Sequence, residues 1–174
     1  MPDQDSLTRR ELIQITAVSM AGALPGQASG ETAKFFTKDE FVLVDELTEL
    51  IIPADEHSPG ARAAEVAAYI DARLAEAFED RPRQIWREGL KRIDAVSQEM
   101  HGSPFMQATS GQRAGLLERI SKHEENPKTP EENFFREMKA RTAHAYYTSK
   151  IGIHQEMEYK GNVLLQEFAG YEVK

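Results

Sequence analysis

Apolar residues recur along most of the chain at the spacing of one helical face. In the first such segment Phe41, Val44, Leu47 and Leu50 follow one another three residues apart. Residues three and four apart lie on the same side of an α-helix, so this spacing predicts an amphipathic helix. The segment 38–52 is therefore predicted to form the first helix of a folded body.

Residues that cap or stop a helix mark both ends of this segment. Thr37 and Glu40 have the spacing of a capping box, in which each side chain accepts a hydrogen bond from the other residue's backbone N–H. Pro53 stops the helix, because the residue before a proline is pushed away from the helical conformation. A loop over residues 53–60 is expected to follow.

The same spacing predicts four further helices, at about 61–78, 82–102, 110–125 and 130–149. The apolar face of the second is predicted to comprise Val66, Ala67, Ile70, Leu74 and Phe78. Pro82 is a favoured first-turn residue and predicts the start of the third. Thr109 and Thr129 stand at the fourth and fifth starts as predicted N-caps.

The periodic pattern weakens after Gly152, where residues 154–174 are expected to form an irregular tail with aromatic side chains. No run of alternating β-branched residues predicts a strand. We therefore expect an all-α fold, a single-domain bundle of about five helices with an irregular aromatic C-terminal tail. A chain of 174 residues has the length of one domain.

The net charge and the absence of cysteine argue against several classes of function. The net charge is −8 and the isoelectric point is about 5.2. An acidic surface repels phosphate backbones, so no nucleic-acid partner is expected. The absence of cysteine excludes disulfides, thiolate metal sites and cysteine nucleophiles from this chain.

A different pattern precedes the helices, in residues 1–30. Arg9 and Arg10 stand before the apolar stretch Ile15–Leu24, which is shorter than the roughly twenty residues that a membrane-spanning helix needs. With the apolar residue Leu12 two positions after the arginines, the segment resembles a twin-arginine export signal. The alternative is an amphipathic first helix of a cytosolic domain. We expect a signal over 1–30 and a helical domain over 31–174, with cleavage left open.

A search for catalytic or metal chemistry finds one small cluster. Asp55, Glu56 and His57 lie together in the loop after the first helix, where carboxylates and an imidazole could transfer protons or hold a divalent ion. We favour the alternative of a solvated turn. The dinucleotide fingerprint, the phosphate-binding P-loop and the H-E-x-x-H zinc motif are all missing. No catalytic, cofactor-binding or metal-binding residue is therefore assigned.

Aromatic residues near the C-terminus form the candidate partner interface. Tyrosine combines a large contact area with a polar tip and is enriched at interfaces. The alternative is that the rings close one end of the bundle, and both interpretations can hold for different rings. The candidate residues are Tyr146, Tyr147, Tyr159, Phe168 and Tyr171.

Several short motifs occur in a specific order along the chain. They comprise Ile51-Ile52-Pro53 with an acidic loop, Pro59-Gly60-Ala61, the pair Ile70-Asp71, Tyr146-Tyr147-Thr148-Ser149, Ile151-Gly152 and Glu158-Tyr159-Lys160-Gly161-Asn162. In this order they resemble the gluconate 2-dehydrogenase subunit 3 family. The resemblance spans most of the chain after the predicted signal.

The resemblance implies a small, non-catalytic subunit. Its implied partner is a large FAD-dependent dehydrogenase of the glucose–methanol–choline type, which oxidises gluconate, other sugars or glycosides and passes electrons to a cytochrome or quinone. FAD would be bound by that partner and not by this chain, and a c-type cytochrome subunit is a further candidate partner.

We therefore expect an accessory subunit that supports the maturation and stability of the flavoprotein and carries it through the twin-arginine translocase. The expected location is the periplasm, with membrane association through the complex left open. One alternative is a stand-alone exported helical enzyme or metal protein that uses Asp55, Glu56 and His57. Another is a binding module for a different exported protein.

Overall fold

The computed structural model describes residues 33–159 and residue 161, and this part of the chain is helical without any strand. The predicted all-α fold is thus confirmed. The predicted signal residues Arg9, Arg10 and Leu12 lie outside the described residues, as do the tail aromatics Phe168 and Tyr171.

The described helices follow one another in the order that the sequence predicts. The α-helices are α2 (Lys38–Ile51), α3 (Gly60–Ala63), α4 (Val66–Ala75), α5 (Asp80–His101), α6 (Ser110–Ser121) and α7 (Pro130–Tyr147). A 3₁₀ turn, η3 (Phe105–Gln107), precedes α6, and a π-helical turn, η4 (Gly152–Glu156), follows α7. Five of these described helices have ten residues or more, which confirms the predicted number.

Capping boxes begin three of the helices. The side chains of Thr37, Thr109 and Thr129 each accept a hydrogen bond from the backbone N–H of the residue three positions on. The side chain of that residue accepts a hydrogen bond from the backbone N–H of the threonine. Two backbone N–H groups at each helix start thereby gain an acceptor that the helix itself does not supply. The predicted starts of α2, α6 and α7 are confirmed.

The second predicted helix, at 61–78, is wrong in two respects. The chain breaks it at Glu65, which has a left-handed backbone with a φ of 54° and separates α3 from α4. The helix also ends at Ala75, so Phe78 does not join the apolar face and is fully exposed in the turn before α5. In addition, α5 begins at Asp80, two residues before the predicted Pro82.

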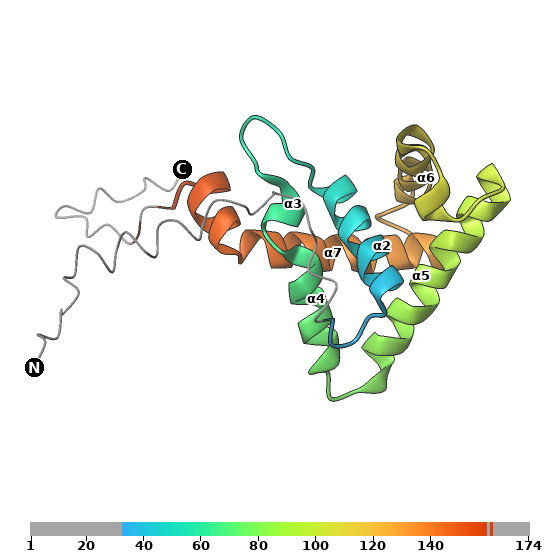
Figure 1. Ribbon diagram of the computed structural model, residues 1–174, viewed down its shortest axis with the longest axis horizontal. Helices are drawn as coiled ribbons and strands as arrows, with labels where there is room; N and C mark the ends of the chain where they lie inside the picture. Colours follow the sequence, from blue (N-terminus) through green and yellow to red (C-terminus); the bar gives the residue numbers. More distant parts are fainter. Residues whose placement is uncertain (1–32, 160, 162–174) are drawn as a thin grey trace, which may run out of the picture.

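Helix α7 crosses the middle of the molecule and packs against α2, α4, α5 and α6 (Figure 1). The helices α4 and α5 diverge from their connecting turn on opposite sides of α2 in that view. The largest fully buried side chains include Trp86, Tyr146, Phe105, Leu47, Leu90 and Ile93. This core fixes the positions of the loops that emerge from it.

A glycine allows the two longest described helices to approach each other. A Cβ atom at Gly89 of α5 would lie 2.1 Å from the ring of Phe134 on α7. The edge of the Phe134 ring also meets Trp86, with ring centroids 5.4 Å apart. None of the described helices has the length and hydropathy needed to span a membrane.

Candidate partner interface

The loop between α2 and α3 is folded by its own polar groups. One carboxylate oxygen of Asp55 accepts the backbone N–H groups of His57 and Ser58 at 2.8 and 2.7 Å. The Asp55 N–H donates in turn to the Ser58 carbonyl at 2.8 Å. The hydrogen bonds from the backbone of His57 and then of Ser58 lower the pKa of Asp55 below its ordinary 3.8, so this carboxylate is ionised at neutral pH.

Glu49 closes the base of the same loop. Its two carboxylate oxygens accept the backbone N–H groups of Ala54 at 3.1 Å and Arg62 at 2.8 Å. Gly60 lies against this carboxylate with a φ of +82°, and a Cβ atom there would be 2.7 Å from both Glu49 Oε1 and the Ala54 nitrogen. The glycine of the Pro-Gly-Ala motif is thus required by backbone conformation and by space.

A buried hydrogen bond ties this loop to the end of α7. The hydroxyl groups of Ser58 and Tyr146 contact each other although the residues are 88 positions apart in the chain. Both residues are buried, and Ser58 Oγ also accepts the Gly60 N–H at 3.2 Å. The position of the loop is therefore set by the C-terminal end of α7.

The chain after α7 turns back over that same end. A Cβ atom at Gly152 would lie 2.1 Å from the Tyr146 carbonyl oxygen, so only glycine allows this close crossing. The Gly152 N–H donates to Ser149 Oγ at 3.0 Å, and the Tyr159 N–H donates to the Ile153 carbonyl at 3.0 Å. These contacts hold η4 and the residues after it beside the last turn of α7.

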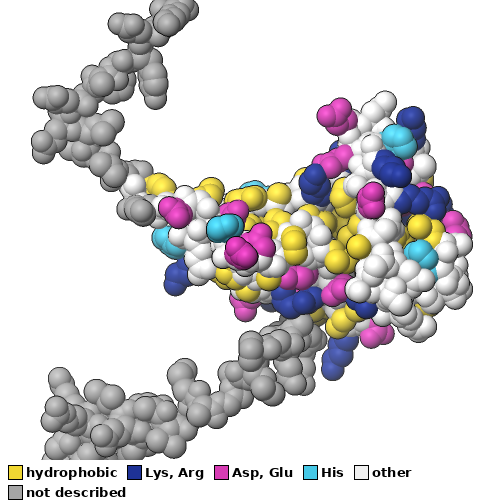
Figure 2. Space-filling view, turned by 90° about the horizontal axis from the view of Figure 1, so that it is seen from above, with side chains coloured by type: hydrophobic (Ala, Val, Ile, Leu, Met, Phe, Trp, Pro, Cys, Tyr) yellow, Lys and Arg dark blue, Asp and Glu magenta, His cyan; other side chains and the backbone are white. Residues whose placement is uncertain are grey.

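Apolar side chains remain exposed around this junction. Large exposed groups are Tyr147, Met157 and Tyr159, with 42%, 51% and 49% of their surface accessible. We define the end surface as these three residues together with the half-buried Ile151, which begins the turn after α7. Viewed from the side on which the 53–59 loop projects, hydrophobic side chains gather over the middle of the molecule (Figure 2).

The structure divides the predicted interface residues between core and surface. Tyr146 is fully buried and belongs to the core, which is one of the two alternatives given for these rings. Tyr147 packs its ring against Tyr146 with centroids 5.3 Å apart but is itself exposed. Tyr147 and Tyr159 therefore remain candidates for a partner contact, whereas Tyr146 positions the surface from beneath.

The three polar residues considered for metal or proton-transfer chemistry are exposed. Asp55 uses one carboxylate oxygen to fold its own loop, and the charge of His57 contributes to the lowered pKa of Asp55. Within the described residues, no group of three or more His, Asp or Glu side chains is placed to hold a metal ion. The loop geometry is that of a turn closed by hydrogen bonds.

A cluster of ion pairs braces α2 against α3 and α6 next to the loop. Arg62 pairs with Asp45 at 2.5 Å and with Glu46 at 3.0 Å, and Arg113 of α6 pairs with Glu46 at 2.6 Å. The hydrogen bond to Asp45 raises the pKa of Arg62. This cluster was not predicted from the sequence, because its paired residues are 16 to 67 positions apart.

Asp71 anchors the first described residues to the body, a role that was not predicted from the sequence. Its carboxylate is buried and accepts three successive backbone N–H groups, from Lys34 at 2.6 Å, Phe35 at 2.9 Å and Phe36 at 2.8 Å. Arg87 adds a hydrogen bond to the Phe35 carbonyl at 2.8 Å. The sequence signal for this role is the position of a carboxylate on the apolar face of a predicted helix.

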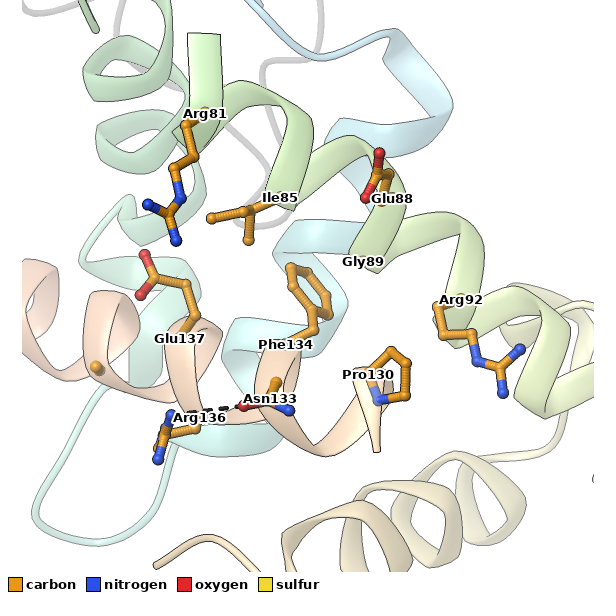
Figure 3. A pocket seen from close by; sticks show the side chains of 11 residues that line it. Arg81, Ile85, Glu88, Gly89, Arg92, Pro130, Asn133, Phe134, Arg136 and Glu137 are labelled. Carbon is orange, nitrogen blue, oxygen red and sulfur yellow. Dashed lines mark hydrogen bonds between the residues drawn. The ribbon is translucent and has the colours of Figure 1, made fainter. Parts of the chain in front are cut away.

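A hollow lies between α5 and α7 on another part of the molecule. It has a volume of about 740 Å³, and its wall includes Ile85 and Phe134. The side chains of Arg81 and Glu137 point toward each other across it (Figure 3). Its charged rim carries both signs, so the hollow favours no single ligand charge.

Comparison with known proteins gives one match. A family model described as gluconate 2-dehydrogenase subunit 3 matches residues 38–163, which include every α-helix described above. The chain has no match among curated proteins or among solved structures. The matched range begins at the first residue of α2 and ends after η4.

Proposed function

Because the chain belongs to the gluconate 2-dehydrogenase subunit 3 family, we propose that it is the non-catalytic small subunit of an FAD-dependent sugar dehydrogenase. Membership of this family makes it an accessory subunit of a dehydrogenase complex. The proposed partner is a large flavoprotein of the glucose–methanol–choline type that oxidises gluconate, another sugar or a glycoside. The match over residues 38–163 is the observation that carries this proposal.

The end surface is the proposed docking site for the flavoprotein. Tyrosine and methionine side chains there can bury apolar area at an interface, and residues of this kind contribute much of the affinity of protein complexes. The Ser58–Tyr146 hydrogen bond and the Asp55 turn hold the surface in one shape before binding. A preformed surface loses less conformational entropy when the partner docks.

The proposed export route uses the N-terminal segment. The translocase would recognise Arg9 and Arg10 together with Leu12, after the flavoprotein has folded and taken up FAD in the cytoplasm. The anchor at Asp71 supports this arrangement, since it fixes the chain to the body from Lys34, shortly after the proposed signal at 1–30. The complex would then function in the periplasm.

Binding would also stabilise the flavoprotein. A subunit that binds the folded partner and not the unfolded one shifts the folding equilibrium of that partner by mass action. We therefore assign the chain a maturation role that needs no chemistry of its own. The partner should accumulate less folded, FAD-loaded protein when this chain is missing.

Purification of the tagged full chain under native conditions tests the proposal. We expect a larger protein to co-purify in a fixed ratio and to show the visible absorbance of bound flavin. Haem absorbance in the same preparation would identify a c-type cytochrome subunit. Recovery of the chain alone, with the flavoprotein present in the same cells but unbound, would contradict the proposal.

A second experiment separates export from binding. Replacement of Arg9 and Arg10 by lysine should leave the complex intact and retain both subunits in the cytoplasm, as measured by cell fractionation. The matched control replaces the exposed Arg81 and Arg119 by lysine, which keeps the charge and should leave export unchanged. Normal export of the first variant would disprove the twin-arginine route without disproving the complex.

A further inference from the structure

Oxidisable sulfur in this chain is confined to methionine, because the sequence has six methionines and no cysteine. The structure describes four of the six, Met100, Met106, Met138 and Met157. Met157 is the most exposed of these four, with 51% of its surface accessible, against 37% for Met106. Met100 is half-buried and Met138 is fully buried. Because oxidation follows exposure, a dissolved oxidant should reach Met157 first among these residues.

A hydrogen-bonded turn presents Met157 to solvent. The Met157 N–H donates to the Gly152 carbonyl at 3.0 Å at the end of η4. Glu158 then has a left-handed backbone with a φ of 48°, and the Tyr159 N–H donates to the Ile153 carbonyl at 3.0 Å. The backbone on both sides of Met157 is therefore held in place while its side chain remains exposed.

Met157 belongs to the end surface together with Tyr147, Tyr159 and Ile151. Methionine at such a surface supplies an apolar contact that adapts to the shape of a partner. Oxidation converts the thioether into a polar sulfoxide, whose oxygen loses its hydrogen bonds with water when a partner covers it. A change of one atom at this position therefore weakens an interface without altering the core.

We propose that Met157 is a reversible oxidation site that regulates docking: its sulfoxide weakens the complex with the flavoprotein, and enzymatic reduction restores it. This inference rests on the proposed function, because it concerns the same surface. The oxidant is hydrogen peroxide, which reduced flavins produce when they transfer two electrons to dioxygen. One peroxide oxygen bonds to the Met157 sulfur as the O–O bond breaks, so that sulfur loses two electrons and the second oxygen leaves with both protons as water. The proposed partner thus produces the oxidant to which its own docking surface responds.

The first measurement needs no partner. The purified full chain is treated with hydrogen peroxide, the reaction is stopped with catalase at a series of times, and the sulfoxide at each methionine is quantified by mass spectrometry of its peptides. Sulfoxide should form at Met157 at least about tenfold faster than at the buried Met138. Equal rates at these two residues in the folded chain would overturn the proposal.

The second measurement compares affinities for the flavoprotein. The chain is oxidised, freed of peroxide and then mixed with untreated flavoprotein, so that only this subunit carries sulfoxide. Oxidation should raise the dissociation constant of the wild type about tenfold, because a polar group is buried without a hydrogen-bond partner. Methionine sulfoxide reductase should restore the original value.

Two variants assign the effect to one residue. Met157→Leu should have the same dissociation constant before and after peroxide treatment. The matched control is Met106→Leu, which changes an exposed methionine of η3 outside the end surface and should lose affinity on oxidation as the wild type does. An equal loss for Met157→Leu and wild type, or a wild type whose affinity oxidation leaves unchanged, would overturn this inference and leave the proposed function standing. Untreated wild type that does not bind the flavoprotein would overturn both.

Discussion

Two buried carboxylates, Asp71 and Glu132, accept backbone N–H groups and do not pair with lysine or arginine. Asp71 accepts those of Lys34, Phe35 and Phe36. Glu132 accepts those of Lys128 at 2.6 Å and Thr129 at 3.1 Å, and it contacts the ring of His123 at 2.7 Å. At the residue scale, each of these side chains fixes a segment of backbone that forms no regular structure.

Asp71→Asn should lower the free energy of unfolding by about 1–3 kcal/mol. A buried backbone N–H would lose its acceptor, and the NH₂ group of the amide would face backbone N–H groups, which cannot accept its hydrogen bond. Urea unfolding measures this loss. The matched control is the exposed Asp39→Asn, which should change stability by less than about 0.5 kcal/mol. Equal effects of the two substitutions would show that the Asp71 anchor adds nothing to stability.

Glu132 should make stability depend on pH in the acid range. The hydrogen bond from His123 and then those from the backbone lower the pKa of Glu132 below its ordinary 4.5. A lowered pKa in the folded state adds stability above the unfolded pKa, and this stability is lost as the pH falls from 4.5 through the folded value.

The urea midpoints of wild type and Glu132→Gln should therefore differ at neutral pH and converge in acid. The exposed Glu118→Gln is the control, and its difference from wild type should stay small at every pH. A gap between wild type and Glu132→Gln that persists unchanged into acid would contradict the assignment.

At the scale of elements, helix starts were predictable and one helix break was not. The caps at Thr37, Thr109 and Thr129 act over three residues, so the sequence alone identifies them. The break at Glu65 has no local signal, since glutamate favours a helix and the left-handed conformation costs it roughly 1–2 kcal/mol. Contacts of Arg62 with α2, and of α4 with α7, fix the two halves in different directions.

Gly60→Ala should disrupt the loop between α2 and α3. The left-handed backbone costs alanine about 1–2 kcal/mol, and the new Cβ would add a clash with Glu49 and the Ala54 nitrogen. Gly115→Ala is the matched control, because open space surrounds it inside α6 and alanine should stabilise the helix by about 1 kcal/mol. Thermal unfolding measures both, and a neutral Gly60→Ala would contradict the close packing.

At the scale of the whole molecule, the sequence predicted the fold class and the family but not the shape of the candidate interface. Tyr147 and Tyr159 were recognised from residue type alone, while the burial of Tyr146 depends on its contact with Ser58, 88 positions away. Phe78 shows the opposite error, since the helical spacing placed it in the core and the early end of α4 leaves it exposed.

Flavin recovery with surface variants tests whether the end surface binds a flavoprotein. The tagged chain is purified natively as wild type, as Tyr147→Ala with Met157→Ala, and as Phe78→Ala. The control residue Phe78 is a fully exposed aromatic in the turn between α4 and α5, outside the end surface. The measured quantity is bound flavin per tagged chain.

Wild type and Phe78→Ala should recover stoichiometric flavin. The double variant should recover much less flavin, because truncating interface anchors lowers the affinity for the partner by about tenfold or more. A folded double variant that retains all of its flavoprotein would contradict the proposal that the end surface is the docking site. Wild type that recovers no flavin at all from cells containing the flavoprotein would contradict the proposed function itself.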